Sequence, residues 1–190
     1  MFTQNNPYIM KLYKPDEPFI GNGKKEDMTI GDFWSFQFSN IYSDPDEIAE
    51  YIVAKALEIT EPYNKEGWTV FDILYRNKRI EVKETAYYHP WEGKINKNRR
   101  FDIHKSANYG ESDFERQNDI YVFCILTGET KEAAFPLNLD NWIFYVVPTN
   151  VINEKFDNQK SVSSNVIAKL VKKTAYCDLK ETIDEVIDAL

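Results

Sequence analysis

The stretch that most restricts the fold is a strongly apolar run at residues 118–128, NDIYVFCILTG. Its β-branched and aromatic residues predict a strand, and WIFYVVP at residues 142–148 predicts another that ends at Pro148. A helical pattern and a hairpin pattern precede both strands, and two further helical patterns follow them. A helix, a hairpin, more strands and terminal helices imply an α/β domain with a central mixed sheet covered by helices.

The clearest helix is predicted at residues 43–60, SDPDEIAEYIVAKALEIT. Pro45 suits the first helical position, Asp44 suits the N-cap, and Glu47 completes a capping box. At helical spacing one stripe is apolar, and it consists of Ile48, Ala49, Ile52, Val53, Ala56 and Ile59. Glu50 lies at the edge of this stripe, so it is either a solvated boundary residue or a carboxylate that supports a site on the strands that follow.

The whole chain, residues 1–190, is expected to form one domain, because 190 residues suffice for a single core and nothing divides them. Residues 1–30 are predicted to be an irregular arm, and residues 28–43 a short helix or turn that packs on the core. The stretches at 161–173 and 179–190 predict two closing helices. No apolar run reaches the roughly 20 residues that span a bilayer.

A hairpin is predicted at residues 68–88, WTVFDILYRNKRIEVKETAYY, with a polar turn at 76–78. Glu81 and Lys83 flank Val82, so their side chains share one face of the second strand. Asp72 lies inside the first strand, where aspartate is uncommon. Desolvating these charges is unfavourable unless something uses them. An ion pair between Asp72 and Lys83 is the structural explanation, and a catalytic site is the functional one.

Three carboxylates and an ammonium group at one place suit phosphodiester hydrolysis. Carboxylate oxygens are the ligands that Mg²⁺ prefers, and Mg²⁺ can polarise a phosphodiester and activate a bound water. A nearby lysine, either partly deprotonated by burial or held as a fixed cation, can orient the water or stabilise developing charge. Mn²⁺ is the expected substitute metal. The residues of this predicted site are Glu50, Asp72, Glu81 and Lys83.

This arrangement, a helix carboxylate followed by D-x8-E-x-K on two strands, resembles the PD-(D/E)XK nuclease superfamily. The sequence also looks like a group of restriction-endonuclease-like bacterial proteins in segments between about residues 28 and 180, including TIGDFWSFQFS, EIAEYIVAKAL, ERQNDIYVFCIL and LDNWIFYVVPTNVIN. The resemblance implies a restriction-endonuclease-like core. It also implies that Asp72 and Glu81 are metal ligands, Lys83 is the catalytic lysine, and Glu50 supports the metal or its water.

Three positions relate to this resemblance less simply. Phe71 precedes Asp72, where the superfamily name has proline. His89 stands where the similar proteins tend to have glutamine, and it is either a minor site residue or a surface residue beside Pro90. Gln117 matches the pattern, and it either contributes to the site or caps the apolar strand that follows.

A basic window at residues 76–105 holds nine basic and four acidic residues, so it carries +5 in a chain of net charge −8. Within it we expect Lys94, Lys97, Arg99 and Arg100 to contact nucleic-acid phosphates. Trp91 precedes GKINKNRR and could stack on a base. The alternative is an ordinary solvated loop.

Cys124 and Cys177 have no metal-type or redox-type spacing, so both are expected to be reduced packing thiols, as in a cytoplasmic protein. The leading hypothesis is a Mg²⁺-dependent endonuclease of restriction or defence type that cleaves double-stranded DNA, as a homodimer because two strands are cut. Two alternatives remain open: a nuclease-fold domain that binds nucleic acid or a protein without cleavage, and a nuclease specific for RNA or for a structure.

Overall fold

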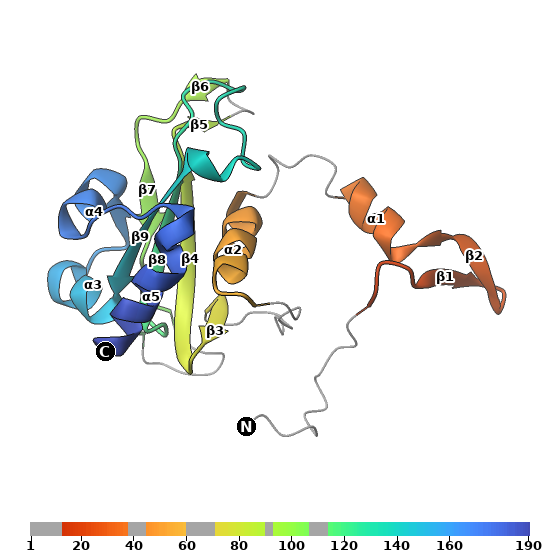
Figure 1. The fold of residues 1–190 in the computed structure, drawn as a ribbon, viewed down its shortest axis with the longest axis horizontal. Coiled ribbons are helices and arrows are strands. Elements are labelled where there is room, and N and C mark those ends of the chain that lie inside the picture. Colours follow the sequence, from red (N-terminus) through yellow and green to blue (C-terminus); the bar gives the residue numbers. More distant parts are fainter. Residues whose placement is uncertain (1–12, 38–44, 60–70, 90–92, 107–113) are drawn as a thin grey trace.

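The computed structural model describes residues 13–37, 45–59, 71–89, 93–106 and 114–190. Its centre is a mixed four-stranded sheet in the order β3-β4-β8-β9 (Figure 1). Strand β4 is antiparallel to β3 and parallel to β8, and β9 is antiparallel to β8. The predicted α/β class with a mixed sheet and flanking helices is confirmed. The strands are β3 (Ile73–Tyr75), β4 (Lys78–Ala86), β8 (Ile120–Leu126) and β9 (Trp142–Pro148).

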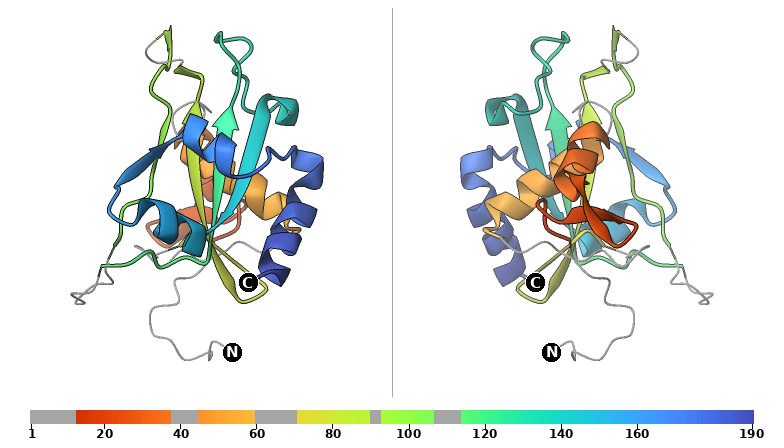
Figure 2. Two further views of the ribbon diagram at one scale, coloured as in Figure 1. Left: turned by 90° about the vertical axis from the view of Figure 1, so that its left-hand side faces the viewer. Right: turned by 90° about the vertical axis from the view of Figure 1, so that its right-hand side faces the viewer.

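Each face of the sheet has its own apolar core. Helices α2 (Pro45–Ala56) and α5 (Leu179–Asp188) cover the face that bears Ile80 and Val82 of β4. Helices α3 (Thr149–Phe156) and α4 (Ser164–Leu170) cover the other face, together with a ribbon of β7 (Arg100–Asp102) and β10 (Ser161–Ser163). Figure 2 shows these two layers on either side of the sheet. Every residue of β8 is buried, which explains its continuous apolar sequence.

Helix α2 and the turn between β3 and β4 follow their sequence patterns. Helix α2 begins at Pro45, and its predicted stripe is buried at Ala49, Ile52 and Val53. Asp44, its predicted N-cap, lies outside the described residues. The β3–β4 turn has Arg76 and Asn77 at φ angles of 48° and 62°, the left-handed geometry of a two-residue hairpin.

The prediction of an irregular arm is wrong for part of its length. Strands β1 (Pro18–Gly21) and β2 (Lys24–Thr29) form an antiparallel hairpin. Asn22 and Gly23 make its turn with φ angles of 48° and 74°, so the Asn-Gly pair was the overlooked signal. Residues 1–12 of the predicted arm lie outside the described residues.

The segment after this hairpin forms a helix, α1 (Ile30–Gln37), but the expected packing on the core is wrong. Phe33, Trp34 and Phe36 are 48%, 38% and 81% exposed, because α1 lies with β1 and β2 to one side of the sheet (Figure 1). The described residues contain no helix that is both long enough and apolar enough to cross a membrane. Cys124 is buried as expected, whereas Cys177 is exposed, so its expected packing role is wrong.

Helix α3 follows β9 directly, where the sequence pattern at Pro148 predicts only the end of a strand. The chain turns into α3 directly after Pro148, which occupies the N-cap. At the other end the buried guanidinium of Arg116 donates hydrogen bonds to the Phe156 and Gln159 carbonyls, both at 3.1 Å. A cation at the C-terminus of a helix satisfies carbonyls that have no helical partner. The remaining elements are β5 (Tyr88–His89), β6 (Lys94–Ile95), and the 3-10 turns η1 (Leu139–Asn141) and η2 (Tyr176–Asp178).

Candidate functional site

Asp72 lies just before β3, at a bend, and the prediction that it lies inside the strand is wrong. Its backbone N–H donates to the Ile80 carbonyl at 3.0 Å. Its carboxylate Oδ2 accepts a hydrogen bond of 2.7 Å from the Val82 N–H, on the edge of β4 that β3 leaves open. An aspartate is tolerated here because its side chain replaces a strand partner for Val82.

Glu81 and Lys83 lie on one face of β4, as predicted, with buried Val82 pointing to the other. The Lys83 Nζ is 2.5 Å from the Glu81 Oε1, and the two side chains are 32% and 18% exposed. In the register with β8 they stand beside Tyr121 and Phe123, which belong to the α3–α4 side of the core. The pair is therefore a half-buried ion pair at the rim of that core.

The charges around Lys83 determine its protonation. Burial by itself lowers the pKa of the Lys83 ammonium, but the charge of Glu81 and the hydrogen bond to it oppose burial. The carboxylates of Asp72 and Asp102 add to this, and the net effect raises the pKa of Lys83. Of the two roles expected for this lysine, the arrangement favours the fixed cation.

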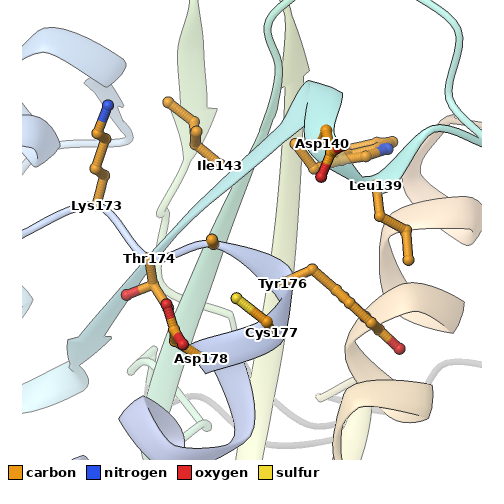
Figure 3. A pocket seen from close by; sticks show the side chains of 10 residues that line it. Leu139, Asp140, Ile143, Lys173, Thr174, Tyr176, Cys177 and Asp178 are labelled. Atoms are coloured by element: carbon orange, nitrogen blue, oxygen red, sulfur yellow. The ribbon is translucent and has the colours of Figure 1, made fainter.

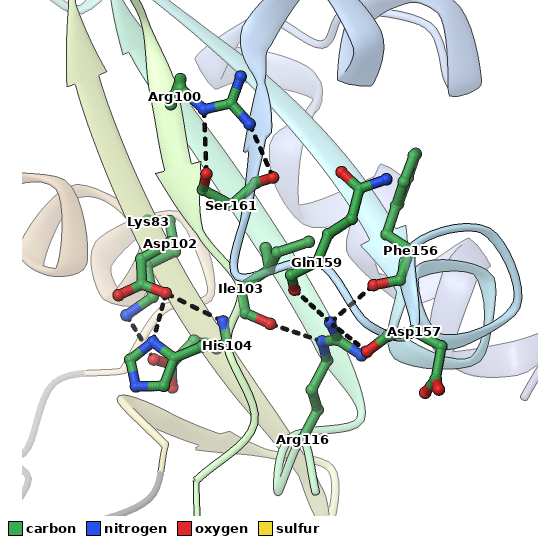
Figure 4. A network of polar contacts seen from close by, with 11 residues as sticks. Lys83, Arg100, Asp102, Ile103, His104, Arg116, Phe156, Asp157, Gln159 and Ser161 are labelled. Atoms are coloured by element: carbon green, nitrogen blue, oxygen red, sulfur yellow. Dashed lines mark hydrogen bonds and ion pairs between the residues drawn. The ribbon is translucent and has the colours of Figure 1, made fainter.

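Asp102 and His104 belong to the same cluster, although the sequence patterns did not single them out. The Asp102 Oδ1 lies 2.5 Å from the His104 Nδ1 and accepts a 2.9 Å hydrogen bond from the His104 backbone N–H. Burial tends to raise the pKa of Asp102, but the bonds to His104 and the charge of Lys83 lower it. Figure 4 shows the His104 ring against the Asp102 carboxylate, and it also draws Lys83.

A period of two in the sequence could have revealed Asp102 and His104. Phe101 and Ile103 are almost fully buried, and the polar residues alternate with them on the opposite side. The stretch RFDIH thus presents an aspartate and a histidine on one side of a short strand, and β7 lies in contact with β4.

Glu50 lies half-buried on α2, which covers the face of β4 opposite to Glu81 and Lys83. The structure therefore groups Asp72, Glu81 and Lys83 more directly than it groups Glu50 with them. Among the residues that the structure describes, β4 beyond Glu81 pairs only with β8, and no other described strand lies on its second edge beside Asp72. A carboxylate on α2 would join the cluster around this edge.

Glu84 is a second buried carboxyl on β4 that the sequence interpretation overlooked. It follows Ile80 and Val82 on the face toward α2, where its Oε1 is buried without a hydrogen-bond partner among the described residues. Burial raises the pKa of Glu84 to about 8, and the nearby Asp46 carboxylate adds to this rise. The signal was a charge within the apolar repeat of Ile80, Val82 and Ala86.

The four basic residues proposed to contact nucleic acid differ in their surroundings. The side chains of Lys94 and Lys97 are exposed. The Arg99 guanidinium lies 4.1 Å from the centre of the Tyr87 ring and donates to the Asn96 carbonyl at 2.5 Å. Arg100 donates to the Ser161 Oγ and carbonyl at 3.0 and 2.9 Å. The two arginines therefore have structural contacts, and the exposure of the two lysines makes them candidates for contacts with phosphate.

Three further residues were predicted as possible contributors to the site or to nucleic-acid binding. His89 is in β5 and pairs with Lys94, whereas Trp91 lies outside the described residues. Gln117 is buried directly before β8. The capping contacts there come from Asn118, whose Nδ2 donates to the Ile120 carbonyl at 3.0 Å and to the Thr149 Oγ1 at 2.9 Å.

A pocket of about 520 Å³ lies elsewhere, between the start of β9 and the segment that leads into α5 (Figure 3). Trp142, Ile143, Lys173, Tyr176 and Cys177 are among its lining residues. None of the predicted site residues lines it, and its single lysine stands among two aspartates and apolar side chains. The pocket therefore has no evident relation to the charged cluster on β4.

Comparison with known proteins does not identify the chain: no family model matches the sequence, and no curated protein matches it either. Within the described ranges, no three histidine, cysteine, aspartate or glutamate side chains form a ready metal cluster. Asp72 and Glu81 are nevertheless hard oxygen donors, and Mg²⁺ typically takes only one or two protein carboxylates. The chemistry of this donor pair fits Mg²⁺ or Mn²⁺.

Proposed function

We propose that this protein is a Mg²⁺-dependent endonuclease that hydrolyses phosphodiester bonds of double-stranded DNA, with a restriction-endonuclease-like core and a role in restriction or defence. The observation that carries the proposal is the half-buried Glu81–Lys83 ion pair, 2.5 Å long, near the Asp72 carboxylate, which is held by the Val82 N–H of the same strand. It supports the sequence pattern of aspartate followed by glutamate, one residue and lysine.

In this proposal Asp72 and Glu81 would hold the Mg²⁺, which supplies electrophilic activation of the phosphodiester and of a water. Lys83 is a cation under the surrounding negative charge, so it suits the stabilisation of charge that develops on the phosphoryl oxygens. Asp72 contacts the backbone of β4 through Oδ2, which fixes its carboxylate relative to Glu81. Glu50 would act from α2, around the edge of β4 beside Asp72.

The proposed partner is DNA. Lys94 and Lys97 are exposed on the basic window, while the rest of the chain is strongly acidic, so phosphates would be attracted to this region in particular. Trp91 and His89 lie close to these lysines in the sequence and are proposed as minor contacts. Cleavage of both strands is simplest with a homodimer, which provides two sites.

One observation favours a second candidate, a nuclease-fold domain that binds nucleic acid or a protein without cleavage. Glu81 and Lys83 already neutralise each other, and Asp72 already has a backbone partner. A charge cluster that is satisfied in this way can persist for structural reasons alone. The two candidates differ in what removal of Lys83 does.

The test is cleavage of supercoiled plasmid, linear duplex, single-stranded DNA and RNA, each with Mg²⁺ and with Mn²⁺. Wild-type protein is expected to cleave duplex DNA. Lys83→Ala should lose at least ~10²-fold in cleavage rate, the scale of one positioned electrostatic group, and keep most of its DNA affinity. Lys180→Ala is the matched control, because it removes another lysine of an ion pair, with Glu58, on the far layer.

Three results would contradict the proposal. If Lys83→Ala cleaves as fast as wild type, the assigned role of Lys83 is wrong. If wild type binds DNA and cleaves none of the substrates with either metal, the non-catalytic alternative is correct. If wild type cleaves RNA in preference to DNA, the substrate is RNA and the proposed substrate class is wrong.

A further inference from the structure

The proposed hydrolysis raises the question of where the proton of the attacking water goes. The inference that follows rests on the proposed function. The Lys83 ammonium lies 2.5 Å from the Glu81 carboxylate, and an ammonium group only donates hydrogen bonds. Glu81 itself is engaged by Lys83, and Asp72 is engaged by the Val82 N–H. A different proton acceptor is therefore needed beside this cluster.

The pair of Asp102 and His104 has the geometry of such an acceptor. The lowered pKa of Asp102 means that its carboxylate is ionised near neutral pH and can only accept hydrogen bonds. The 2.5 Å contact therefore requires a proton on the His104 Nδ1. In a neutral ring this leaves the Nε2 lone pair available, and the side chain is 56% exposed, so water can reach it.

The pair of Asp102 and His104 interacts with Lys83 of the charged cluster as well as with its own backbone. Asp102 also accepts from the His104 backbone N–H, which accounts for the local bend after β7. That local role does not require the ring to contact the carboxylate, nor Asp102 to interact with Lys83. Both are found, and Figure 4 shows the His104 ring held against the Asp102 carboxylate.

We propose that His104 is the general base that accepts a proton from the attacking water, and that Asp102 is the positioning residue that fixes its ring. In this step the water oxygen forms a bond to phosphorus, and one water proton passes to the His104 Nε2. The P–O bond to the leaving oxygen breaks, and its electron pair stays on that oxygen, which takes a proton from solvent. The imidazolium then returns its proton to solvent, so atoms and charge balance.

The first test measures the ring itself and needs no substrate. Long-range ¹H–¹⁵N spectra distinguish the two neutral forms of histidine, and with only two histidines in the chain a His89→Gln variant assigns the signals. At a pH where the ring is neutral, we expect His104 to carry its proton on Nδ1, and Asp102→Ala to lose this preference. A proton on Nε2 in wild type would overturn the inference, whatever the protein cleaves.

The second test measures cleavage of plasmid with Mg²⁺ under single-turnover conditions. His104→Ala should lose about 10²-fold in rate, and added imidazole should restore part of the rate, because a small base can replace the missing ring. Imidazole should not restore Lys83→Ala. Asp157→Asn is the matched control, since it breaks the neighbouring exposed ion pair with Lys105 and should cleave like wild type.

Failure of this inference differs from failure of the proposed function. If wild type cleaves and His104→Ala cleaves equally fast, or loses activity that imidazole does not restore, His104 is not the base and the nuclease assignment stands. If thermal unfolding shows that His104→Ala is not folded, His104→Gln is tested in its place. Full activity of His104→Gln would overturn the inference. If wild type cleaves no substrate, the proposed function fails and the assignment of His104 fails with it.

Discussion

Each face of β4 carries a glutamate, and the two glutamates have different surroundings. On one face Glu81 lies 2.5 Å from the Lys83 ammonium and near further charged groups of β7. On the other face, three residues along the strand, Glu84 has a buried Oε1 without a hydrogen-bond partner among the described residues. Asp46 on α2 brings more negative charge to Glu84.

The comparison indicates that burial raises the pKa of a carboxyl on this strand when no cation lies beside it. Removing a carboxylate from water disfavours its ionised form unless a cation compensates. The compensated face keeps separated charges that can act on a phosphodiester. The uncompensated face responds by binding a proton, as the pKa of about 8 for Glu84 shows.

The largest expected effect concerns stability and Glu84. The pKa of Glu84 is raised from 4.5 to about 8 in the folded chain, so between these values the folded state binds more protons than the unfolded state. The free energy of unfolding should therefore fall as the pH rises through this window. Glu84→Gln should remove this part of the pH dependence and raise the free energy of unfolding at pH 8 by about 1–3 kcal/mol.

Urea unfolding of wild type and Glu84→Gln between pH 5 and 8.5 measures this effect. Equal pH slopes in the two proteins would mean that Glu84 is ionised in the folded state through a partner, and the contrast between the two faces would then disappear.

The next prediction separates the structural role of the Asp72 side chain from its proposed role in metal binding. Asp72→Ala removes the acceptor for the Val82 N–H and should cost about 1 kcal/mol of stability, whereas Asp72→Asn keeps an oxygen acceptor and should cost less. Both variants should lose cleavage, because both lack the charge that a divalent metal requires. Thermal unfolding and plasmid cleavage are measured together, and an active Asp72→Asn would restrict Asp72 to its strand-edge role.

The smallest effect concerns the basic window. Lys94→Ala with Lys97→Ala should reduce the magnitude of the slope of log affinity for DNA against log salt by about 2, because about two fewer phosphates would be neutralised. Lys172→Ala with Lys173→Ala is the control, as these residues form another exposed basic pair. Fluorescence anisotropy over a range of salt concentrations measures both. A slope that changes equally in the two double variants would indicate net charge alone.

Local patterns predicted those parts of the fold that depend on neighbours in the sequence. Alternation placed Glu81 and Lys83 on one face, Pro45 marked the start of α2, and the apolar run gave β8. The same rules were available for the hairpin at Asn22 and Gly23, and were not applied. Helix α3 is different, since Arg116, more than thirty residues earlier in the chain, binds its final carbonyls.

The candidate site was predictable only within one hairpin. Asp102 and His104 reach Lys83 because β7 crosses the face of the sheet, and no spacing in the sequence encodes that approach. The charge state of Glu84 likewise depends on α2 packing over it, which brings Asp46 close. The structural role of Asp72 required the register of β3 and β4 to be known.

The most direct test of the account is calorimetric titration with Mn²⁺ of wild type, Glu81→Gln and Glu84→Gln. These variants make the same substitution on opposite faces of one strand. We expect the heat of Mn²⁺ binding to be lost in Glu81→Gln and retained in Glu84→Gln, because Glu81 belongs to the proposed metal site with Asp72, whereas the raised pKa of about 8 keeps Glu84 largely protonated near neutral pH. Equal heats in wild type and Glu81→Gln, or loss only in Glu84→Gln, would contradict the account.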